Sequence, residues 1–417
     1  MEDISIKCEE AAEQPVSTSP QSPPQPPTFA LPPEIPTMEA VNDIKFDFNN
    51  GLRVRFPETE EYRCVFKDLD TDCLLYSMDV KPGCTVESIK KYFVRFGLEV
   101  YKKDSLKEPV FQHDFNLTGQ PVLIQLPIGA LGDTIAWFSC IERFQKQNSC
   151  EILCSMTEPL ADLFKAQYPK IKFISRDDAT EIKPYATYNL GLFFGGDTDH
   201  QPYDFRAVGL HRTAGHILGL KDLSDLPPRV NLSAERKIKE KYVVIAAQAS
   251  SQCKYWNNPY GWRETVSYLK EQGYRVLCID KMTEYGVDFI WNHIPYGSED
   301  FTGDLPLQQR IDLIKDADMF IGLSSGLSWL AWCCQIPVIL ISGFTDPVNE
   351  FGTPYRVINS SVCHGCWNDM RCDFNHFDFL WCPRHKENGR KFECTKMITA
   401  KMVIDQIKTI QGGTLCK

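Results

Sequence analysis

Two strand-to-helix turns of this sequence carry side chains that could do chemistry. In "PIGALGDTIAW", residues 127–137, Gly129 and Gly132 allow a tight turn, and Asp133 stands in the first turn of the following helix. A carboxylate there is favourable on electrostatic grounds alone, but facing a crevice it could take a proton from a hydroxyl as a general base. Lys254, in "AAQASSQCKYWN", follows a buried strand. Lysine is usually a solvated surface residue, yet at a crevice its ammonium could stabilise a departing diphosphate.

The segment "MFIGLSSGLSWLAWC", residues 319–333, predicts a strand, a small polar turn and a helix. The first amides of a helix have no intrahelical partner and carry the positive end of the helix dipole, so they form an anion site. Gln248 and Ser250 add polar side chains from the lysine loop. Together with Lys254 the turn predicts a phosphate site, with backbone donors at Ser324, Ser325, Gly326 and Leu327.

A cysteine-rich segment, "VCHGCWNDMRCDFNHFDFLWC", occupies residues 362–382. Cys363 and Cys366 form a Cys-x-x-Cys pair; Cys382 follows after fifteen residues and Cys394 after eleven more. This spacing predicts a structural zinc finger, because a site closed by four thiolates leaves no position for substrate. Alternatively the thiols are unpaired, or one ligand is another residue of the segment: Cys372, His364, His376 or His385.

Composition narrows the functional class. The chain has 417 residues, 43% of them hydrophobic, and a net charge of -10, which repels nucleic acid. No apolar run reaches the length of a spanning helix, and the acidic N-terminus lacks the basic and apolar regions of a signal peptide. We therefore expect a cytoplasmic protein with reduced thiols. Most of its cysteines should be small core residues, including Cys140, Cys150, Cys154, Cys278, Cys333 and Cys334.

The elements that must position these residues fall into four parts. Residues 1–37 contain a proline- and serine-rich stretch and are expected to be a disordered tail. Alternating runs broken by Asn-Asn-Gly and Lys-Pro-Gly predict a β-rich domain over 38–118. Strands alternate with helices over 119–225 and again over 226–417, which includes the finger 363–394. The predicted fold class is α/β: a GT-B arrangement of two Rossmann-like halves with a crevice between them.

Four features together resemble the bacterial autotransporter heptosyltransferases, relatives of the lipopolysaccharide heptosyltransferases: "GALGDTIAW", the lysine loop, "DLIKDADMFIGLSSGLSWLA" and the cysteine-rich segment. The resemblance covers most of residues 38–400. It implies protein O-glycosylation, in which heptose moves from ADP-D-glycero-β-D-manno-heptose to serine hydroxyls of an autotransporter passenger before export. It also implies an inverting transfer that needs no metal, and a ring-shaped homo-oligomer, a dodecamer.

Matched position by position, the resemblance makes Asp133 the base and Lys254 the ligand of the donor diphosphate. Backbone contacts to the donor would come from Ala130, Leu131 and Gly132, and the nucleotide-sugar pocket would include Gln248, Ser250 and the turn Ser324 to Leu327. The family's finger holds one iron per chain, here through Cys363, Cys366, Cys382 and Cys394, with zinc as the alternative metal.

One departure limits the comparison. The lipopolysaccharide relatives carry Asp-Thr-Gly-Leu-Ser-His at the turn where this chain has Ser-Ser-Gly-Leu-Ser-Trp. This chain therefore lacks the side-chain roles of that aspartate and histidine, whereas the backbone N–H groups of the turn can still donate hydrogen bonds. Asp280, at the end of "YRVLCID", could accept a ribose hydroxyl. The alternatives are transfer of heptose to a lipid-linked sugar, and a non-catalytic scaffold stapled by a metal, which would have no reason to keep both Asp133 and Lys254.

Overall fold

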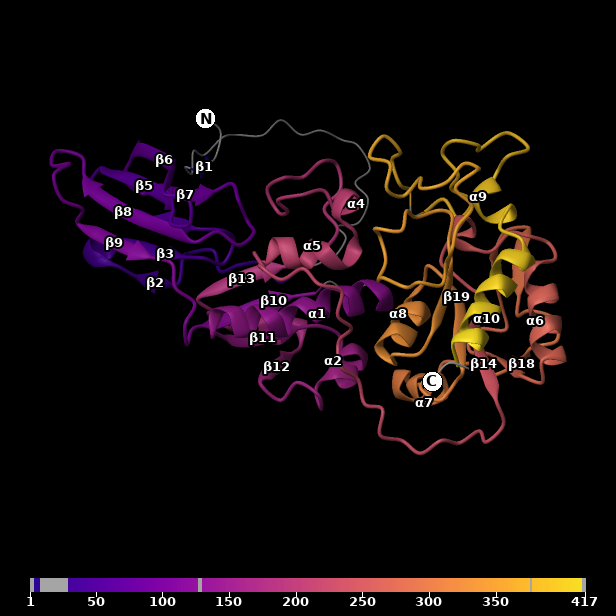
Figure 1. Cartoon of the computed structure of the whole chain (residues 1–417). Coiled ribbons are helices and arrows are strands. Elements are labelled where there is room, and N and C mark those ends of the chain that lie inside the picture. Colours follow the sequence, from indigo (N-terminus) through magenta and orange to yellow (C-terminus); the bar gives the residue numbers. More distant parts are fainter. Residues whose placement is uncertain (1–3, 8–28, 127–129, 376, 415–417) are drawn as a thin grey trace.

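The structure is a computed structural model, and it describes residues 4–7, 29–126, 130–375 and 377–414. The chain folds into three parts that follow one another in sequence order. In Figure 1 the β-rich part lies at the left, the first α/β half in the middle and the second α/β half at the right. No helix in these ranges is both long and apolar enough to cross a membrane.

The β-rich part consists of two antiparallel sheets. Phenylalanine, tyrosine and valine side chains from both sheets are buried between them, which explains the alternating pattern of the sequence. The first sheet has the order β1 (Ile4–Lys7), β7 (Thr85–Ser88), β4 (Arg53–Arg55), β3 (Lys45–Asp47), β2 (Met38–Glu39). The second has the order β6 (Cys73–Val80), β5 (Tyr62–Asp68), β8 (Phe96–Lys102), β9 (Phe111–Asp114).

Part of the predicted tail belongs to the fold, so the prediction for residues 1–37 needs correction. Strand β1 pairs with β7, and Ala30 is buried against the first α/β half. There the Gln125 side chain accepts from the Ala30 N–H at 2.8 Å and donates to its carbonyl at 3.0 Å. The buried Gln125 amide thus bonds both the N–H and the carbonyl of Ala30, as a neighbouring strand would, and fixes this segment to the first half. Residues 8–28 lie outside the described residues.

The first α/β half has a four-stranded parallel sheet in the order β12-β11-β10-β13, with helices on its faces. Its strands end at one edge, where the turn to α1 begins. The elements are β10 (Pro121–Gln125), α1 (Leu131–Asn148), β11 (Glu151–Ser155), α2 (Glu158–Phe164), β12 (Ile171–Ile174), α3 (Arg176–Glu181), β13 (Ala186–Asn189), α4 (Phe205–Val208) and α5 (Leu210–Ile217).

The second half has a six-stranded sheet, β18-β15-β14-β19-β20-β21, in which every described pairing is parallel. Its elements are β14 (Tyr242–Ala246), η2 (Gln252–Lys254), α6 (Gly261–Glu271), β15 (Arg275–Cys278), the hairpin β16 (Glu284–Val287) and β17 (Ile290–His293), β18 (Glu299–Asp300), α7 (Leu307–Ile314), β19 (Met319–Leu323), α8 (Gly326–Cys333), β20 (Val338–Ile341), β21 (Arg356–Val357), α9 (Glu393–Lys396) and α10 (Ala400–Thr414). The two Rossmann-like halves and the added β-rich part confirm the predicted GT-B class.

Helices α1 and α8 meet where the halves face each other (Figure 1). A Cβ placed on Gly326 would lie 2.8 Å from the Cβ of Leu131, and one on Gly132 would lie 2.8 Å from the ring of Trp329. Because real Cβ atoms do not approach so closely, glycine is needed at both positions. The close contact brings two helix N-termini, each with a positive dipole end, to one point of the crevice.

The six cysteines expected in the core are buried free thiols: Cys140, Cys150, Cys154, Cys278, Cys333 and Cys334. The expectation of reduced thiols throughout is wrong at Cys84, which is disulfide-bonded.

Candidate active site

Two cavities lie side by side in the crevice between the halves, and they share Ser250, Ser325 and Gly326. The Asp133 cavity, of about 1060 Å³, also contains Ala130, Gly132, Asp133, Lys254 and Ser324. The Asp280 cavity, of about 1050 Å³, also contains Leu131, Gln248, Asp280 and Leu327. The predicted catalytic and donor-binding residues are thus brought together around one crevice, although their roles stay predictions. Gly129 lies outside the described residues.

Asp133 occupies the first turn of α1, whose N-cap residue, Ala130, forms no side-chain cap hydrogen bond. Burial raises the pKa of its carboxyl above the ordinary aspartate value, and the positive charge of Lys254 opposes that rise. The two groups therefore act on each other electrostatically, although they come from different halves. A carboxylate that is partly desolvated is a stronger base than one in water, which suits proton transfer.

Lys254 ends the short helix η2 that follows β14. Its ammonium lies 3.5 Å from the Ser250 hydroxyl and 5.7 Å from the centre of the Phe344 ring. Among the described residues, no carboxylate forms a close ion pair with it. A cation held against an aromatic ring beside a cavity keeps donors free for an anionic ligand.

The turn before α8 is supported by a buried carboxylate. The Ser324 hydroxyl donates to Glu350 at 2.5 Å, and Arg356 holds the other oxygen of Glu350 at 2.6 Å. Glu350 is only 2% exposed. Its ion pair with Arg356 offsets the free-energy cost of burying the negative charge. Ser324 is thereby fixed in place, while the buried Ser325 hydroxyl has no partner among the described groups and lies between the two cavities. No sequence pattern indicates this role of Glu350, because it depends on tertiary contacts alone.

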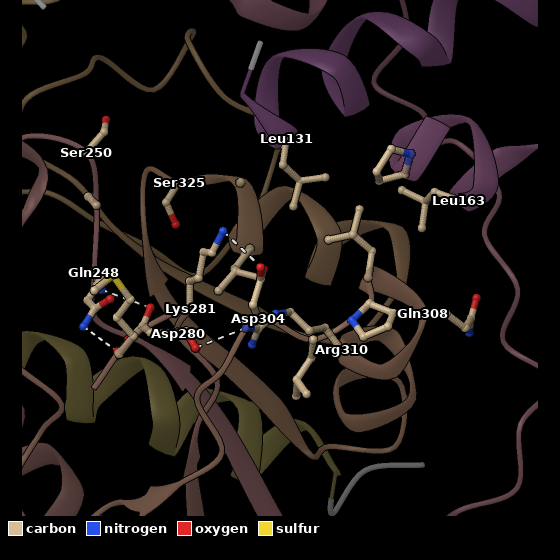
Figure 2. A pocket seen from close by; sticks show the side chains of 18 of the residues that line it. Leu131, Leu163, Gln248, Ser250, Asp280, Lys281, Asp304, Gln308, Arg310 and Ser325 are labelled. Carbon is tan, nitrogen blue, oxygen red and sulfur yellow. Dashed lines mark hydrogen bonds and ion pairs between the residues drawn. The ribbon is translucent and has the colours of Figure 1, made fainter. Parts of the chain in front are cut away.

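Figure 2 shows the Asp280 cavity, with Leu131 and Leu163 of the first half above residues of the second. The buried Asp280 carboxylate accepts the N–H groups of Ala247 at 2.8 Å and Gln248 at 3.2 Å. Burial raises the pKa of Asp280 despite these bonds. Its first role is therefore to hold the end of β14, and its predicted contact with a ribose stays a prediction.

Arg310 completes this cavity, and sequence reasoning missed it because it stands in an ordinary amphipathic helix. It is buried, and its guanidinium donates to the carbonyls of Ile279, Asp280 and Gly303. Burial lowers the pKa of Arg310, and the charge of Asp280 opposes this effect. It therefore braces the loop that ends β15.

The cysteine-rich segment forms an aromatic and sulfur cluster, in which Cys363, Cys366 and Cys382 pack with residues such as Phe344 and Trp381. Burial and repulsion from Cys253, Cys382 and Cys363 raise the pKa of Cys394 to about 12, which places its thiol near theirs. Several cysteine sulfur atoms lie close together here, and thiolate sulfur is a ligand type that both zinc and iron accept.

The side chains of this cluster are not arranged around a single metal position, however. In the described part of the chain, no three His, Cys, Asp or Glu side chains converge as ligands of one ion. The four-cysteine site and its alternatives Cys372, His364 and His385 therefore stay predictions, and His376 lies outside the described residues. Cys253 is an addition to the cluster that spacing could not suggest, since it lies more than a hundred residues earlier in the sequence.

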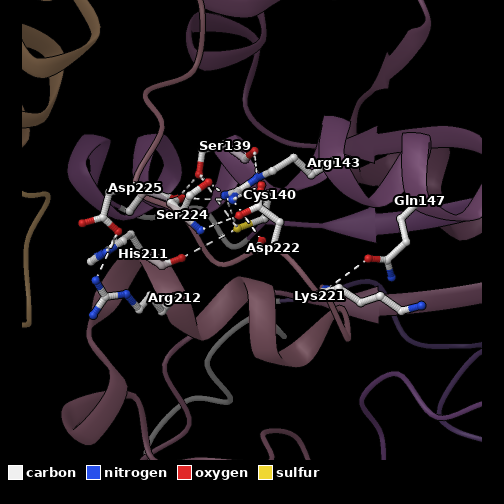
Figure 3. A network of polar contacts seen from close by, with 11 residues as sticks. Ser139, Cys140, Arg143, Gln147, His211, Arg212, Lys221, Asp222, Ser224 and Asp225 are labelled. Carbon is white, nitrogen blue, oxygen red and sulfur yellow. Dashed lines mark hydrogen bonds and ion pairs between the residues drawn. The ribbon is translucent and has the colours of Figure 1, made fainter. Parts of the chain in front are cut away.

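A polar network fixes the back of α1 to the chain that links the two halves (Figure 3). Arg143 donates to the carbonyls of Asp222 at 3.1 Å and Ser224 at 2.9 Å, and His211 contacts Asp225 at 2.5 Å. Burial lowers the pKa of His211, and the charge of Asp225 opposes this. The linker is thus attached at several points close to where the halves meet.

The chain matches two known protein families. Residues 41–104 match "Glycosyltransferase TibC, N-terminal domain", and residues 221–372 match "Glycosyltransferase family 9 (heptosyltransferase)". The autotransporter heptosyltransferase Aah of Escherichia coli is 54% identical to it over 385 residues, which cover 92% of this chain and 97% of Aah. The chain belongs to the autotransporter heptosyltransferase family.

A second member of this family has a solved structure. Iron-containing, dodecameric TibC of enterotoxigenic E. coli, in complex with ADP-D-beta-D-heptose, matches with a TM-score of 0.90 and 49% identity, covering 92% of this chain and 100% of TibC. The inactive autotransporter heptosyltransferase BimC of Burkholderia thailandensis is 38% identical over 386 residues, which cover 92% of this chain and 90% of BimC.

Proposed function

We propose that this heptosyltransferase moves heptose from ADP-D-glycero-β-D-manno-heptose to serine hydroxyls of an autotransporter passenger, with inversion at the anomeric carbon. The observation that carries the proposal is that Asp133 and Lys254, from different halves, line one cavity and act on each other electrostatically. Similarity to Aah and to TibC with its bound ADP-heptose supports the substrate assignment.

In the proposed reaction, Asp133 accepts the proton of a serine hydroxyl as that oxygen bonds to the anomeric carbon. The bond from this carbon to the diphosphate breaks on the opposite face, and ADP leaves with the bonding electrons. Lys254 and the first amides of α8 stabilise the negative charge that develops on the diphosphate. No metal ion takes part in these steps.

The two cavities suggest where the donor is held. The diphosphate would lie at the residues shared by both cavities, Ser250, Ser325 and Gly326, beside Lys254. The nucleotide would extend into the Asp280 cavity, which Gln248 and Leu327 also line, and the heptose into the Asp133 cavity. The backbone of Ala130, Leu131 and Gly132 would contact the donor from the first half.

We further propose that Cys363, Cys366, Cys382 and Cys394 hold one iron per chain as a structural centre. The gathering of Cys363, Cys366 and Cys382 suits iron and zinc alike, and the likeness to iron-containing TibC supports iron. Elemental analysis and the visible absorption of thiolate-bound iron would test this in the purified chain. Cys382→Ser should lose the metal and its absorption, whereas Cys73→Ser, an exposed thiol on β6, should keep both. Full metal content in Cys382→Ser would contradict the ligand set.

The assembly and place of action follow the family. Likeness to dodecameric TibC supports a homo-oligomeric ring, which light scattering of the purified protein would measure. Modification of a passenger before its export would take place in the cytoplasm.

The deciding experiment is the intact mass of an autotransporter passenger co-expressed with this chain in a host that makes ADP-heptose. The wild-type chain should add mass in heptose steps, and Asp133→Ala should add none while remaining folded. If the wild type modifies no passenger but labels a lipid-linked sugar, the acceptor is wrong. If it transfers no heptose to either acceptor, the chain is a scaffold.

A further inference from the structure

The finger forms one wall of the Asp133 cavity. Here the finger wall means Trp367, Met370, Asp373 and Phe374, which line that cavity together with the segment 194–196 of the first half. These residues lie in the cysteine-rich segment, so the part of the chain predicted to be purely structural borders the space that contains the base, Asp133.

The finger wall is held to both halves. The Trp367 indole donates to Asn349 at 2.9 Å, and Asn368 donates to the carbonyl of Arg206 in the first half at 2.7 Å. The Trp367 ring also lies 5.8 Å from that of Phe205 and 4.9 Å from that of Phe374. These contacts fix the position of the wall between the two halves.

Exposed apolar groups stand on both sides of the cavity. Met370 is 57% exposed and Phe194 is 45% exposed, although both line the cavity. Beside Phe194, a Cβ on Gly195 or Gly196 would meet nothing within 4 Å, so the backbone there borders open space. Apolar side chains facing open space next to a reactive carboxylate are typical of a surface that binds another molecule.

The charges identify what kind of molecule fits. Arg206 is bound in two places by Asp204, at 3.0 Å and 2.8 Å, so its charge is already neutralised. Asp373 is exposed and forms no ion pair with a described residue, so its carboxylate can accept N–H groups. A lipid-linked sugar with its phosphates would be repelled by such a wall, whereas an extended polypeptide supplies N–H donors and apolar contacts.

We propose that the finger wall binds the acceptor polypeptide and guides its serine to Asp133, which makes Met370 and Asp373 residues that determine acceptor specificity. This inference rests on the proposed function. It assigns the finger a recognition role in addition to its structural one. In the proposed function the heptose donor is bound by Lys254 and the N-terminus of α8 instead.

The test compares Met370→Ala, Asp373→Asn and the double variant with wild type, using a purified passenger fragment that wild type modifies. The double variant should raise the KM for the passenger about tenfold, as truncation of central interface residues does. Its kcat and its affinity for ADP should stay within about twofold of wild type, because neither residue contacts the donor in this assignment. Met397→Ala, at a methionine that is 49% exposed but lies outside both cavities, is the matched control and should change nothing.

The outcomes separate the inference from the proposed function. If wild type modifies no passenger, the proposed function fails first. If wild type is active and the variants keep its KM for the passenger, the finger wall does not bind the acceptor. Loss of ADP affinity together with passenger KM would also overturn the inference, because the wall would then serve the donor. Both side chains are exposed, so loss of folding is not expected, and unchanged melting temperatures would verify this.

Discussion

At the level of single residues, Asp133 and Lys254 depend on each other. Burial raises the pKa of Asp133, while the charge of Lys254 opposes the rise. The pair therefore balances two needs: a carboxyl that is desolvated enough to attract a proton, and yet ionised when the acceptor arrives. Neither residue alone would show this balance.

Removing the carboxylate tests the base. Asp133→Asn keeps the size of the side chain but cannot take a proton, so we expect kcat to fall by roughly 10² to 10⁴, the usual contribution of acid–base catalysis. Because the backbone of α1 is unchanged, affinity for ADP should remain. Steady-state rates of passenger modification, with calorimetry of ADP binding, would measure both. A rate within a few-fold of wild type would show that another group is the base.

The pH dependence follows from the direction of the Asp133 shift. The base acts only when ionised, so kcat/KM should fall as the pH drops through the raised pKa of Asp133, above the ordinary aspartate value. Lys254→Met removes the charge that opposes the rise, so the acid limb should move to higher pH. Profiles of kcat/KM between about pH 4 and pH 8, which include the range of about pH 5 to 8 where proteins are usually most stable, would show the movement. An unmoved limb would mean that the two groups do not interact.

At the level of elements, catalysis depends on how closely α1 and α8 approach. Their N-termini meet because Gly132 and Gly326 have no side chain, and the closeness aims both helix ends at the cavities. Sequence reasoning assigned these glycines to turn geometry and donor contacts. The structure adds the packing of one helix on the other, which depends on residues far apart in the chain.

Gly326→Ala should force the helices apart. The new Cβ would lie 2.8 Å from the Cβ of Leu131 and 3.1 Å from the Gly132 nitrogen, both rigidly placed. We expect a stability loss of about 1–3 kcal/mol, as overpacking usually causes, and weaker binding of ADP. Thermal unfolding and calorimetry would report these. Gly412→Ala in α10, where a Cβ meets nothing within 4 Å, is the control and should not lower stability. Equal behaviour of the two variants would contradict the packing argument.

At the level of the whole molecule, the sequence predicts the architecture better than the contacts between its parts. Strand and helix periodicity belong to each segment, so the two α/β halves and the β-rich part could be recognised from the sequence. The burial of Ala30 against Gln125 could not, because a proline-rich segment carries no sign of the partner that holds it. For the same reason Glu350, Arg310 and Cys253 were missed: their roles depend on side chains brought together only by the fold.

The junction of the halves depends on one backbone position. Gly209 has φ of 91°, and a Cβ there would lie 2.0 Å from the carbonyl oxygen of Val348 in the other half. The next residue, Leu210, donates to the carbonyl of Asn349 at 3.0 Å. Asn349 in turn accepts from Trp367, so this contact links α5 to the finger wall.

Gly209→Ala should therefore loosen the halves rather than unfold either. The strained conformation alone costs about 1–3 kcal/mol, and the clash is relieved only if α5 moves away from Val348. We expect faster hydrogen exchange at Leu210 and in the finger wall, and a lower rate of transfer, because Asp133 and Lys254 lie on opposite sides of this junction. The β-rich part contacts α5, because the Phe93 N–H donates to the carbonyl of Ile217 at 2.8 Å. Exchange should therefore stay unchanged only farther away, in β5 and β6, which lie on the side of the β-rich part away from α5 (Figure 1). Uniformly faster exchange throughout the chain would instead mean that the substitution destabilises the first half itself.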